Sequence, residues 1–122
     1  MKLLIVDDSS IIRKAITRYL NEYGLEIVGE AGDGVQALEL MRAHQPDVVT
    51  LDITMPEMDG LTCLDEMLKI DPKIRVIIIS ALSDQATALK ALKAGAKGFL
   101  GKPFTEDKIK EAFDRVVKNE GA

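Results

Sequence analysis

The chain has 122 residues, a single cysteine and a net charge of −4, from 16 lysines and arginines against 20 aspartates and glutamates. This length predicts one domain over 1–122 that buries its own core, and one cysteine excludes an internal disulfide. An acidic chain argues against direct binding of nucleic acid, and its apolar runs are too short to span a membrane. The opening letters MKLLIVDD place two acids where a signal peptide would continue its apolar stretch, so we expect a cytoplasmic protein. We also expect it to be a monomer.

Ten segments along the chain alternate between the pattern of a strand and the pattern of a helix. Helices are predicted where apolar residues recur every three or four positions, and strands where short apolar runs stand between turns. In chain order we predict strand 3–6, helix 10–22, strand 26–30, helix 34–44, strand 47–51, helix 60–69, strand 75–79, helix 84–94, strand 98–101 and helix 105–119. We place helix ends at Gly24 and Gly95 and helix caps at Asp33, Ser83 and Thr105, because these residue types favour such positions.

The strand segments 3–6 and 76–79 are apolar throughout, with no alternation of apolar and polar residues. Such strands are typical of a parallel sheet that is covered on both faces. Parallel strands need crossover connections, and because crossovers are right-handed, the helices divide between the two faces. We therefore predict an α/β fold, a doubly wound five-stranded parallel sheet with five helices.

Four of the predicted strands run directly into polar residues. Asp7 and Asp8 follow the first strand and Asp52 follows the third, while Ser80 and Lys102 follow the fourth and the fifth. In doubly wound sheets, sites form beyond the carboxyl ends of the strands at the point where the strand order reverses. If the order is 2-1-3-4-5, these three acids, the serine and the lysine meet around one crevice.

Three carboxylates in one crevice repel one another, so we expect a cation to neutralise them. Mg²⁺ suits such a site because it takes a few carboxylate and carbonyl oxygens and leaves room for a phosphate oxygen. A carboxylate beside Mg²⁺ and a lysine can attack phosphorus and form an acyl phosphate. Asp52 is the candidate nucleophile, and Asp7 and Asp8 are the candidate metal-holding acids. Lys102 and Ser80 are the candidate partners of the phosphoryl oxygens.

Four segments carry a family resemblance: IVDDSS at 5–10, LDITMPEMDG at 51–60, IIISAL at 77–82 and KAGAKGFLGKPF at 93–104. Through these motifs the whole chain resembles the response-regulator receiver family, CheY-like proteins that accept phosphate from a histidine kinase. The resemblance implies the CheY-like, flavodoxin-like strand order 2-1-3-4-5. It also implies a signalling protein, not an enzyme, that is phosphorylated on Asp52 and assists its own phosphorylation and dephosphorylation.

The same resemblance implies a particular set of metal ligands. Asp8 and Asp52 are expected to bind Mg²⁺ directly, and the backbone carbonyl of Thr54 is expected to be a third ligand. Asp7 is expected to act mostly through water.

The resemblance also implies which residues respond to phosphorylation and which residues influence hydrolysis of the acyl phosphate. It implies that Ser80 and Phe99 are the switch residues, although Phe99 stands where some members carry tyrosine and therefore lacks a hydroxyl. Thr54 and Leu82 are expected to flank the path of the water that hydrolyses the acyl phosphate. The Lys102–Pro103 peptide is expected to be cis.

Three alternatives come from other classes of protein. A flavin-binding electron carrier of the flavodoxin type shares the expected fold, but VDDSS at 6–10 places two anions where the FMN phosphate would lie. A haloacid-dehalogenase-type phosphatase would need a second acid at position 54, where Thr54 stands. An unphosphorylated pseudo-receiver would be expected to lack one of the five site residues, and all five are present.

The output of such a receiver would be binding to a partner protein. We expect the docking surface on helix 84–94, strand 98–101 and helix 105–119, around Phe99. Five lysines are assigned to this surface: Lys90, Lys93, Lys97, Lys108 and Lys110. The residues of the motifs are most similar to those of chemotaxis receivers, which favours a protein that binds a flagellar switch or similar target, with a partner phosphatase. A phosphorelay shuttle and the receiver module of a larger transcriptional regulator remain as alternatives.

Overall fold

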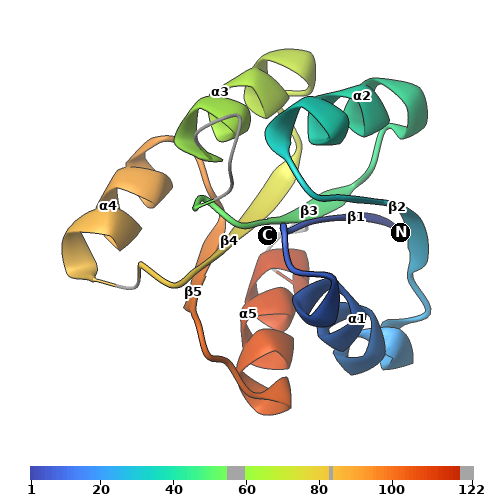
Figure 1. The fold of residues 1–122 in the computed structure, drawn as a ribbon, viewed down its shortest axis with the longest axis vertical. Helices are drawn as coiled ribbons and strands as arrows, with labels where there is room; N and C mark the ends of the chain where they lie inside the picture. The colour runs from blue at the N-terminus through green and yellow to red at the C-terminus, as the bar shows by residue number, and fades with distance from the viewer. Residues whose placement is uncertain (55–59, 83, 119–122) are drawn as a thin grey trace.

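The structure is a computed structural model that describes residues 1–54, 60–82 and 84–118 (Figure 1). Its strands are β1 (Lys2–Val6), β2 (Glu26–Ala31), β3 (Val48–Leu51), β4 (Arg75–Ser80) and β5 (Gly98–Gly101). Its helices are α1 (Ser10–Tyr19), the short 3-10 helix η1 (Asn21–Tyr23), α2 (Gly34–His44), α3 (Gly60–Ile70), α4 (Gln85–Lys93) and α5 (Glu106–Lys118). The predicted alternation of strands and helices is confirmed.

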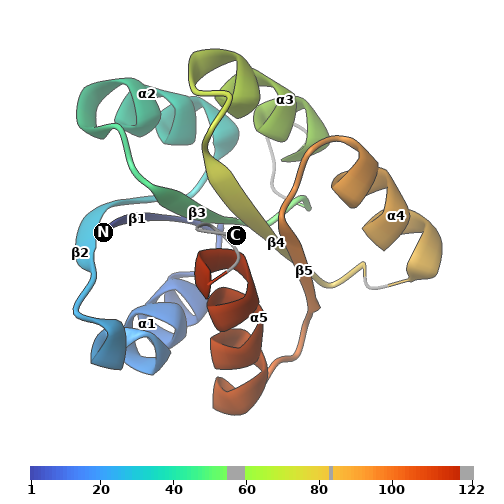
Figure 2. The same cartoon turned by 180° about the vertical axis from the view of Figure 1, so that it is seen from behind.

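The five strands form one parallel sheet in the order β2-β1-β3-β4-β5. Helices α1 and α5 cover one face of the sheet, and α2, α3 and α4 cover the other (Figures 1 and 2). The predicted doubly wound fold and its strand order are therefore confirmed. Because β1 and β3 are neighbours, the order reverses between them, which is where this class of fold places its sites.

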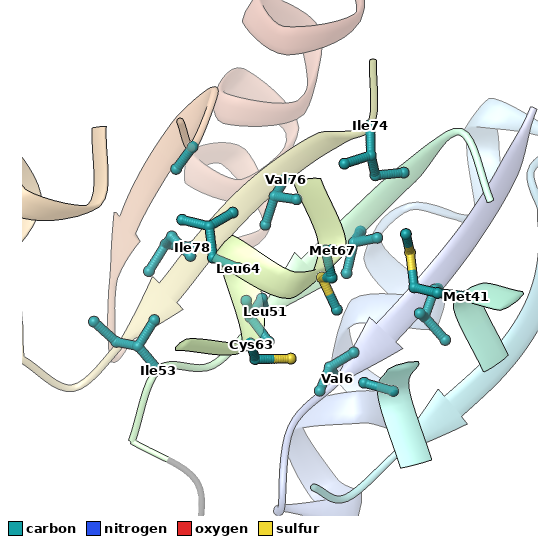
Figure 3. Close-up of a cluster of buried hydrophobic side chains, with 14 of the residues drawn as sticks. Val6, Met41, Leu51, Ile53, Cys63, Leu64, Met67, Ile74, Val76 and Ile78 are labelled. Carbon is teal, nitrogen blue, oxygen red and sulfur yellow. The ribbon is translucent and has the colours of Figure 1, made fainter. Parts of the chain in front are cut away.

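The core consists of one apolar layer on each side of the sheet. On the side of α2 and α3, Met41, Leu64 and Met67 pack against the strands, as Figure 3 shows. On the side of α1 and α5, Ile16 and Phe113 pack against another set of strand residues. Every residue of β3 and β4 is buried, which explains why the run 76–79 within β4 is apolar without alternation.

Side-chain caps fix the starts of the helices. The Asp33 carboxylate accepts a hydrogen bond from Gln36 N at 2.8 Å, and Thr105 Oγ1 accepts one from Lys108 N at 3.2 Å, so both predicted caps are confirmed. The cap predicted at Ser83 is wrong, because Asp84 caps α4; Ser83 itself lies outside the described residues. The Asp84 carboxylate accepts hydrogen bonds from the backbone N of Thr87 at 3.1 Å and from its Oγ1 at 2.7 Å, one at each carboxylate oxygen.

The first helix is shorter than predicted. It ends at Tyr19, and the chain continues through η1 before Gly24 takes a left-handed conformation with φ of 63°. The sequence pattern merged the two helices because Leu20 and Tyr23 continue the apolar spacing of α1 into η1. Gly24 therefore ends the 3-10 turn and not α1 itself.

Among residues 1–54, 60–82 and 84–118, no helix combines the length and the hydropathy that a bilayer span requires.

The start of α3 packs so closely against the chain after β3 that only glycine fits. A Cβ atom on Gly60 would lie 2.1 Å from the backbone Cα of Ile53, whereas a Cβ on Gly32 would meet no atom closer than 3.8 Å. We expect Gly60→Ala to lower the free energy of unfolding by about 3 kcal/mol or more, since the backbone of Ile53 cannot move aside. Gly32→Ala should change it by less than about 1 kcal/mol. Urea unfolding of both variants tests this, and equal stabilities would contradict the packing described.

Candidate functional site

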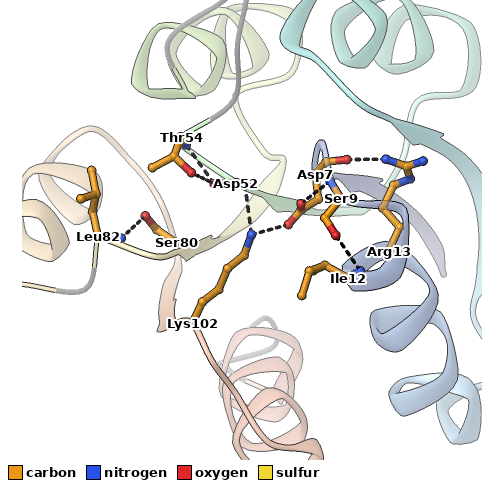
Figure 4. Close-up of polar contacts among 9 residues, drawn as sticks. All are labelled: Asp7, Ser9, Ile12, Arg13, Asp52, Thr54, Ser80, Leu82 and Lys102. Carbon is orange, nitrogen blue, oxygen red and sulfur yellow. Dashed lines mark hydrogen bonds and ion pairs between the residues drawn. The ribbon is translucent and has the colours of Figure 1, made fainter.

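At the carboxyl edge of the sheet, the residue that follows β1, β3 or β5 still makes a backbone hydrogen bond to the neighbouring strand. Asp7 N donates to Ala31 O and Asp52 N donates to Val6 O, both at 2.9 Å, and Lys102 N donates to Ser80 O at 2.8 Å. The residues that follow the strands are therefore held in register with their neighbours. The structure brings together at this edge the side chains that the sequence predicted to meet there, as Figure 4 shows for all of them except Asp8.

Three carboxylates form the centre of the site. Oxygen atoms of Asp7, Asp8 and Asp52 lie within 4.8 Å of one another. Asp7 and Asp52 are buried, with exposed fractions of 1% and 2%, whereas Asp8 is exposed. Removal of two neighbouring carboxylates from water is costly unless a positive charge compensates them.

Lys102 supplies that positive charge. Its Nζ lies 2.8 Å from Asp7 Oδ2 and 3.1 Å from Asp52 Oδ2, so one ammonium joins two buried carboxylates (Figure 4). Burial acts to lower the pKa of Lys102, but its hydrogen bonds to the two acids outweigh burial and raise that pKa above its usual value. Burial raises the pKa of Asp7, although Lys102 and the backbone N of Ser9 oppose that shift.

The arrangement fits a divalent cation. When ionised, three carboxylates beside one ammonium leave two negative charges in excess. Asp8, the exposed acid, has no hydrogen bond or ion pair with any other described residue, so its oxygens are available as ligands. Carboxylate oxygens are hard donors that Mg²⁺ prefers, and an open side leaves room for the waters that this ion retains.

Thr54 contacts Asp52 directly, which the sequence did not predict. Its backbone N and its Oγ1 both donate to Asp52 Oδ1, at 2.8 and 2.7 Å. The Asp52 carboxylate is thus held at both oxygens, by Thr54 on one and by Lys102 on the other. An aspartate that bonds the backbone two residues later is a common turn, so the letters DIT at 52–54 carried a signal for this contact.

Ser80 is fully buried and lies at the same edge, on the strand next to β3. Its Oγ accepts a hydrogen bond from Leu82 N at 2.9 Å (Figure 4). A hydroxyl that accepts in this way keeps its own proton for donation to another group. Leu82 itself is 53% exposed, so an apolar side chain borders the site on the side of α4.

Phe99 is half-buried on β5 and packs against the core layer of α2 and α3. The Lys102–Pro103 peptide is cis, as the family resemblance implied.

Ser9 and Arg13 also belong to the surroundings of the site, and the sequence reasoning missed both. Ser9 caps α1 through its hydroxyl, and its backbone N donates to Asp7 Oδ1 at 2.9 Å. Arg13 Nη1 donates to the backbone carbonyl of Asp7 at 2.5 Å, and Arg13 Nε to Glu30 Oε1 at 3.1 Å. Arg13 acts on a backbone atom, so the pattern of polar side chains gave no sign of this role.

Four of the five lysines assigned to the docking surface are exposed, namely Lys90, Lys93, Lys97 and Lys108. The assignment of Lys110 is wrong. Its ammonium pairs with Glu22 of η1 and, at 2.7 Å, with Glu106, which places it on the side of α5 that faces α1. Arg115, which lines a small pocket with Lys97 and Phe99, lies on the expected surface instead.

Comparisons with known proteins agree with this geometry. The response regulator receiver domain matches residues 3–114. Chemotaxis protein CheY of Bacillus subtilis (strain 168) is 46% identical over 116 residues, which cover 95% of this chain and 97% of that protein. Chemotaxis protein CheY of Thermotoga maritima is 43% identical over 117 residues, 96% of this chain and 98% of that protein.

Solved structures give the same result. A chain of the crystal structure of the CheX-CheY-BeF3-Mg²⁺ complex from Borrelia burgdorferi superposes with a TM-score of 0.92 at 39% identity, covering 96% of this chain and 89% of that one. The family that the four motifs predicted is therefore confirmed: this chain belongs to the response regulator receiver family and is a receiver of the CheY type.

Proposed function

We propose that this protein is a phosphorylation-dependent signalling switch that accepts a phosphoryl group from a histidine kinase onto Asp52. The observation that supports this most directly is the setting of the Asp52 carboxylate. It is buried, each of its oxygens is held by hydrogen bonds, and two further acids and one lysine surround it. A carboxylate fixed in this way is oriented for attack on a phosphoryl group before the donor arrives.

In the proposed reaction, one oxygen of Asp52 forms a bond to phosphorus while the bond from phosphorus to the donor histidine nitrogen breaks. Bound Mg²⁺ would balance the charge on the transferring group. Asp8, Asp52 and the backbone carbonyl of Thr54 are the proposed ligands, with Asp7 acting through water. Lys102, which already lies 3.1 Å from Asp52 Oδ2, moves its hydrogen bond to a phosphoryl oxygen.

Ser80 and Phe99 are the proposed link from the site to the docking surface. The Ser80 hydroxyl donates its free proton to another phosphoryl oxygen. Because Leu82 N is hydrogen-bonded to the Ser80 hydroxyl, this movement of the hydroxyl also moves the loop that contains Leu82. Ser80 and Phe99 lie on the paired strands β4 and β5, next to α4. Phosphorylation therefore changes the surface of α4, β5 and α5, which carries Lys90, Lys93 and Lys97.

That surface is proposed to bind a target in chemotaxis, a flagellar switch or similar protein, because relatives over nearly the whole chain are chemotaxis proteins. The CheX-CheY complex among the similar structures supports a phosphatase as a further partner. A second candidate is the receiver module of a larger regulator. A glutamate methylesterase of Hahella chejuensis supports it, being 42% identical to this chain over 34% of its own length.

The nucleophile is tested by chemical phosphorylation. With Mg²⁺ and acetyl phosphate, we expect the wild-type protein to gain one phosphoryl group and Asp52→Asn to gain none, because an amide is not a nucleophile toward phosphorus. Asp107→Asn, a change at an exposed acid of α5, should be labelled like the wild type. Intact-mass spectrometry reads all three proteins, and equal labelling of Asp52→Asn would remove the assignment of Asp52.

The proposal that Asp8 is a Mg²⁺ ligand is tested by thermal stability. Asp8→Asn should slightly raise the melting temperature without metal, because it relieves repulsion among the acids while Ser9 still caps α1. The wild type should gain about 2.7 kcal/mol from Mg²⁺ at one hundred times its Kd, and the variant should gain almost nothing. Thermal unfolding with and without Mg²⁺ measures both effects, with Asp107→Asn as the charge-matched control. A variant that keeps the full Mg²⁺ stabilisation would show that Asp8 is not a ligand.

The proposal that Leu82 borders the path of the attacking water is tested by the rate at which the phosphoprotein loses phosphate. Leucine can neither orient nor activate water, so Leu82→Glu should speed decay of the phosphoprotein several-fold by holding a water at the mouth of the site. The matched control is Leu92→Glu, since Leu92 is 46% exposed and lies near the far end of α4. Decay is followed by mass in excess Mg²⁺. Identical decay of the three proteins would show that position 82 does not border the path of the attacking water.

A further inference from the structure

Arg13 connects α1 to two other parts of the molecule. Its Nη1 donates to the carbonyl oxygen of Asp7 at 2.5 Å, and its Nε donates to Glu30 on β2 at 3.1 Å. The side chain is only 21% exposed. A planar guanidinium bound to two acceptors has a fixed orientation, so Arg13 holds the Asp7 carbonyl more rigidly than a single hydrogen bond from water would.

With this contact, every polar atom of Asp7 has a partner in a hydrogen bond or, for Oδ2, in an ion pair. Its N bonds Ala31 O at 2.9 Å, its Oδ1 accepts from Ser9 N at 2.9 Å, and its Oδ2 lies 2.8 Å from Lys102 Nζ. Asp8, the next residue, has no such contacts with other described residues. The place of the Asp8 carboxylate is therefore determined by the peptide that joins it to Asp7, and Arg13 bonds the oxygen of that peptide.

We propose that Arg13 is a positioning residue for the divalent cation. It holds the peptide between Asp7 and Asp8 so that the Asp8 carboxylate lies within 4.8 Å of the carboxylates of Asp7 and Asp52. The inference rests on the proposed function, because it assumes that these acids bind Mg²⁺. Residues that orient metal ligands typically contribute tenfold to a hundredfold to metal affinity.

The sign of the effect separates positioning from simple electrostatics. Arg13 is a permanent cation beside the acids, so by charge alone its removal should make Mg²⁺ bind more tightly. If Arg13 serves only to stabilise the fold, its removal should lower the melting temperature and leave the Mg²⁺ affinity unchanged. Positioning predicts weaker binding in spite of the charge that is lost.

The test is titration of Mg²⁺ into the metal-free, full-length protein by isothermal calorimetry. We expect Arg13→Met to raise the Kd for Mg²⁺ about tenfold. Arg13→Lys should raise it less, because lysine can still reach one of the two acceptors. Arg18→Met removes the same charge from an exposed position of the same helix, where Arg18 lies 5.2 Å from the Tyr19 ring, and should leave the Kd unchanged.

An unchanged or lower Kd for Arg13→Met would overturn the proposal. If that variant does not fold, as judged by circular dichroism, Glu30→Ala replaces it. Because Glu30→Ala also removes an acid, which by charge alone weakens Mg²⁺ binding, it is compared with Glu26→Ala at the exposed start of the same strand. Loss of the anchor of Arg13 should raise the Kd more in Glu30→Ala than in Glu26→Ala, and equal Kd values would overturn the proposal. A wild-type protein that gives no Mg²⁺ binding would instead refute the metal site of the proposed function.

Discussion

The ion pairs of Lys102 with Asp7 and Asp52 are the interaction on which the site depends. Two like charges about 4 Å apart cost roughly 4 kcal/mol at an effective dielectric constant near 20, a large part of the stability of a small domain. Lys102 follows β5, which is two strands away from β3 in the sheet. Neighbouring strands lie about 4.8 Å apart, so only a long side chain reaches from the end of β5 across β4 to the acids.

This geometry also explains why Ser80 is placed to respond to a change at Asp52. Ser80 ends β4, the strand that Lys102 must cross, and its carbonyl accepts the hydrogen bond from Lys102 N. In the proposed reaction, a phosphoryl group on Asp52 adds negative charge and oxygen acceptors beside both residues. In that proposal Lys102, which already bonds Asp52, and the Ser80 hydroxyl, which keeps its own proton, are the two groups that respond to the added charge and move the loop behind Ser80.

The fold class was predictable from periodicity, whereas the strand order that makes the site residues meet was implied by the family resemblance. Apolar spacing separated strands from helices, and polar residues at the strand ends placed the acids, Ser80 and Lys102 at one edge. The break between α1 and η1 was not predictable, because apolar spacing continues through it. The error at Lys110 was avoidable, since Lys108 and Lys110 are two positions apart and so about 200° apart around the helix. They cannot both face one partner.

Several of the contacts that the sequence did not reveal are made to or through the backbone. Arg13 bonds a backbone carbonyl, while the backbone N atoms of Ser9 and Thr54 bond the carboxylates of Asp7 and Asp52. Every residue has a backbone carbonyl, and nearly every residue has a backbone N–H, so residue types alone do not reveal such bonds. Burial and these bonds distinguish two of the three acids from the third.

Asp7 and Asp52 are buried and fully held by the chain, whereas Asp8 is exposed and held only through its backbone. Thr54 and Leu82, which follow β3 and β4, are exposed like Asp8. Among the described residues, the site is therefore exposed to solvent at Asp8, Thr54 and Leu82. A cation, a phosphodonor or an attacking water can reach the acids past these side chains, whereas Lys102 pairs with Asp7 and Asp52 on their buried side.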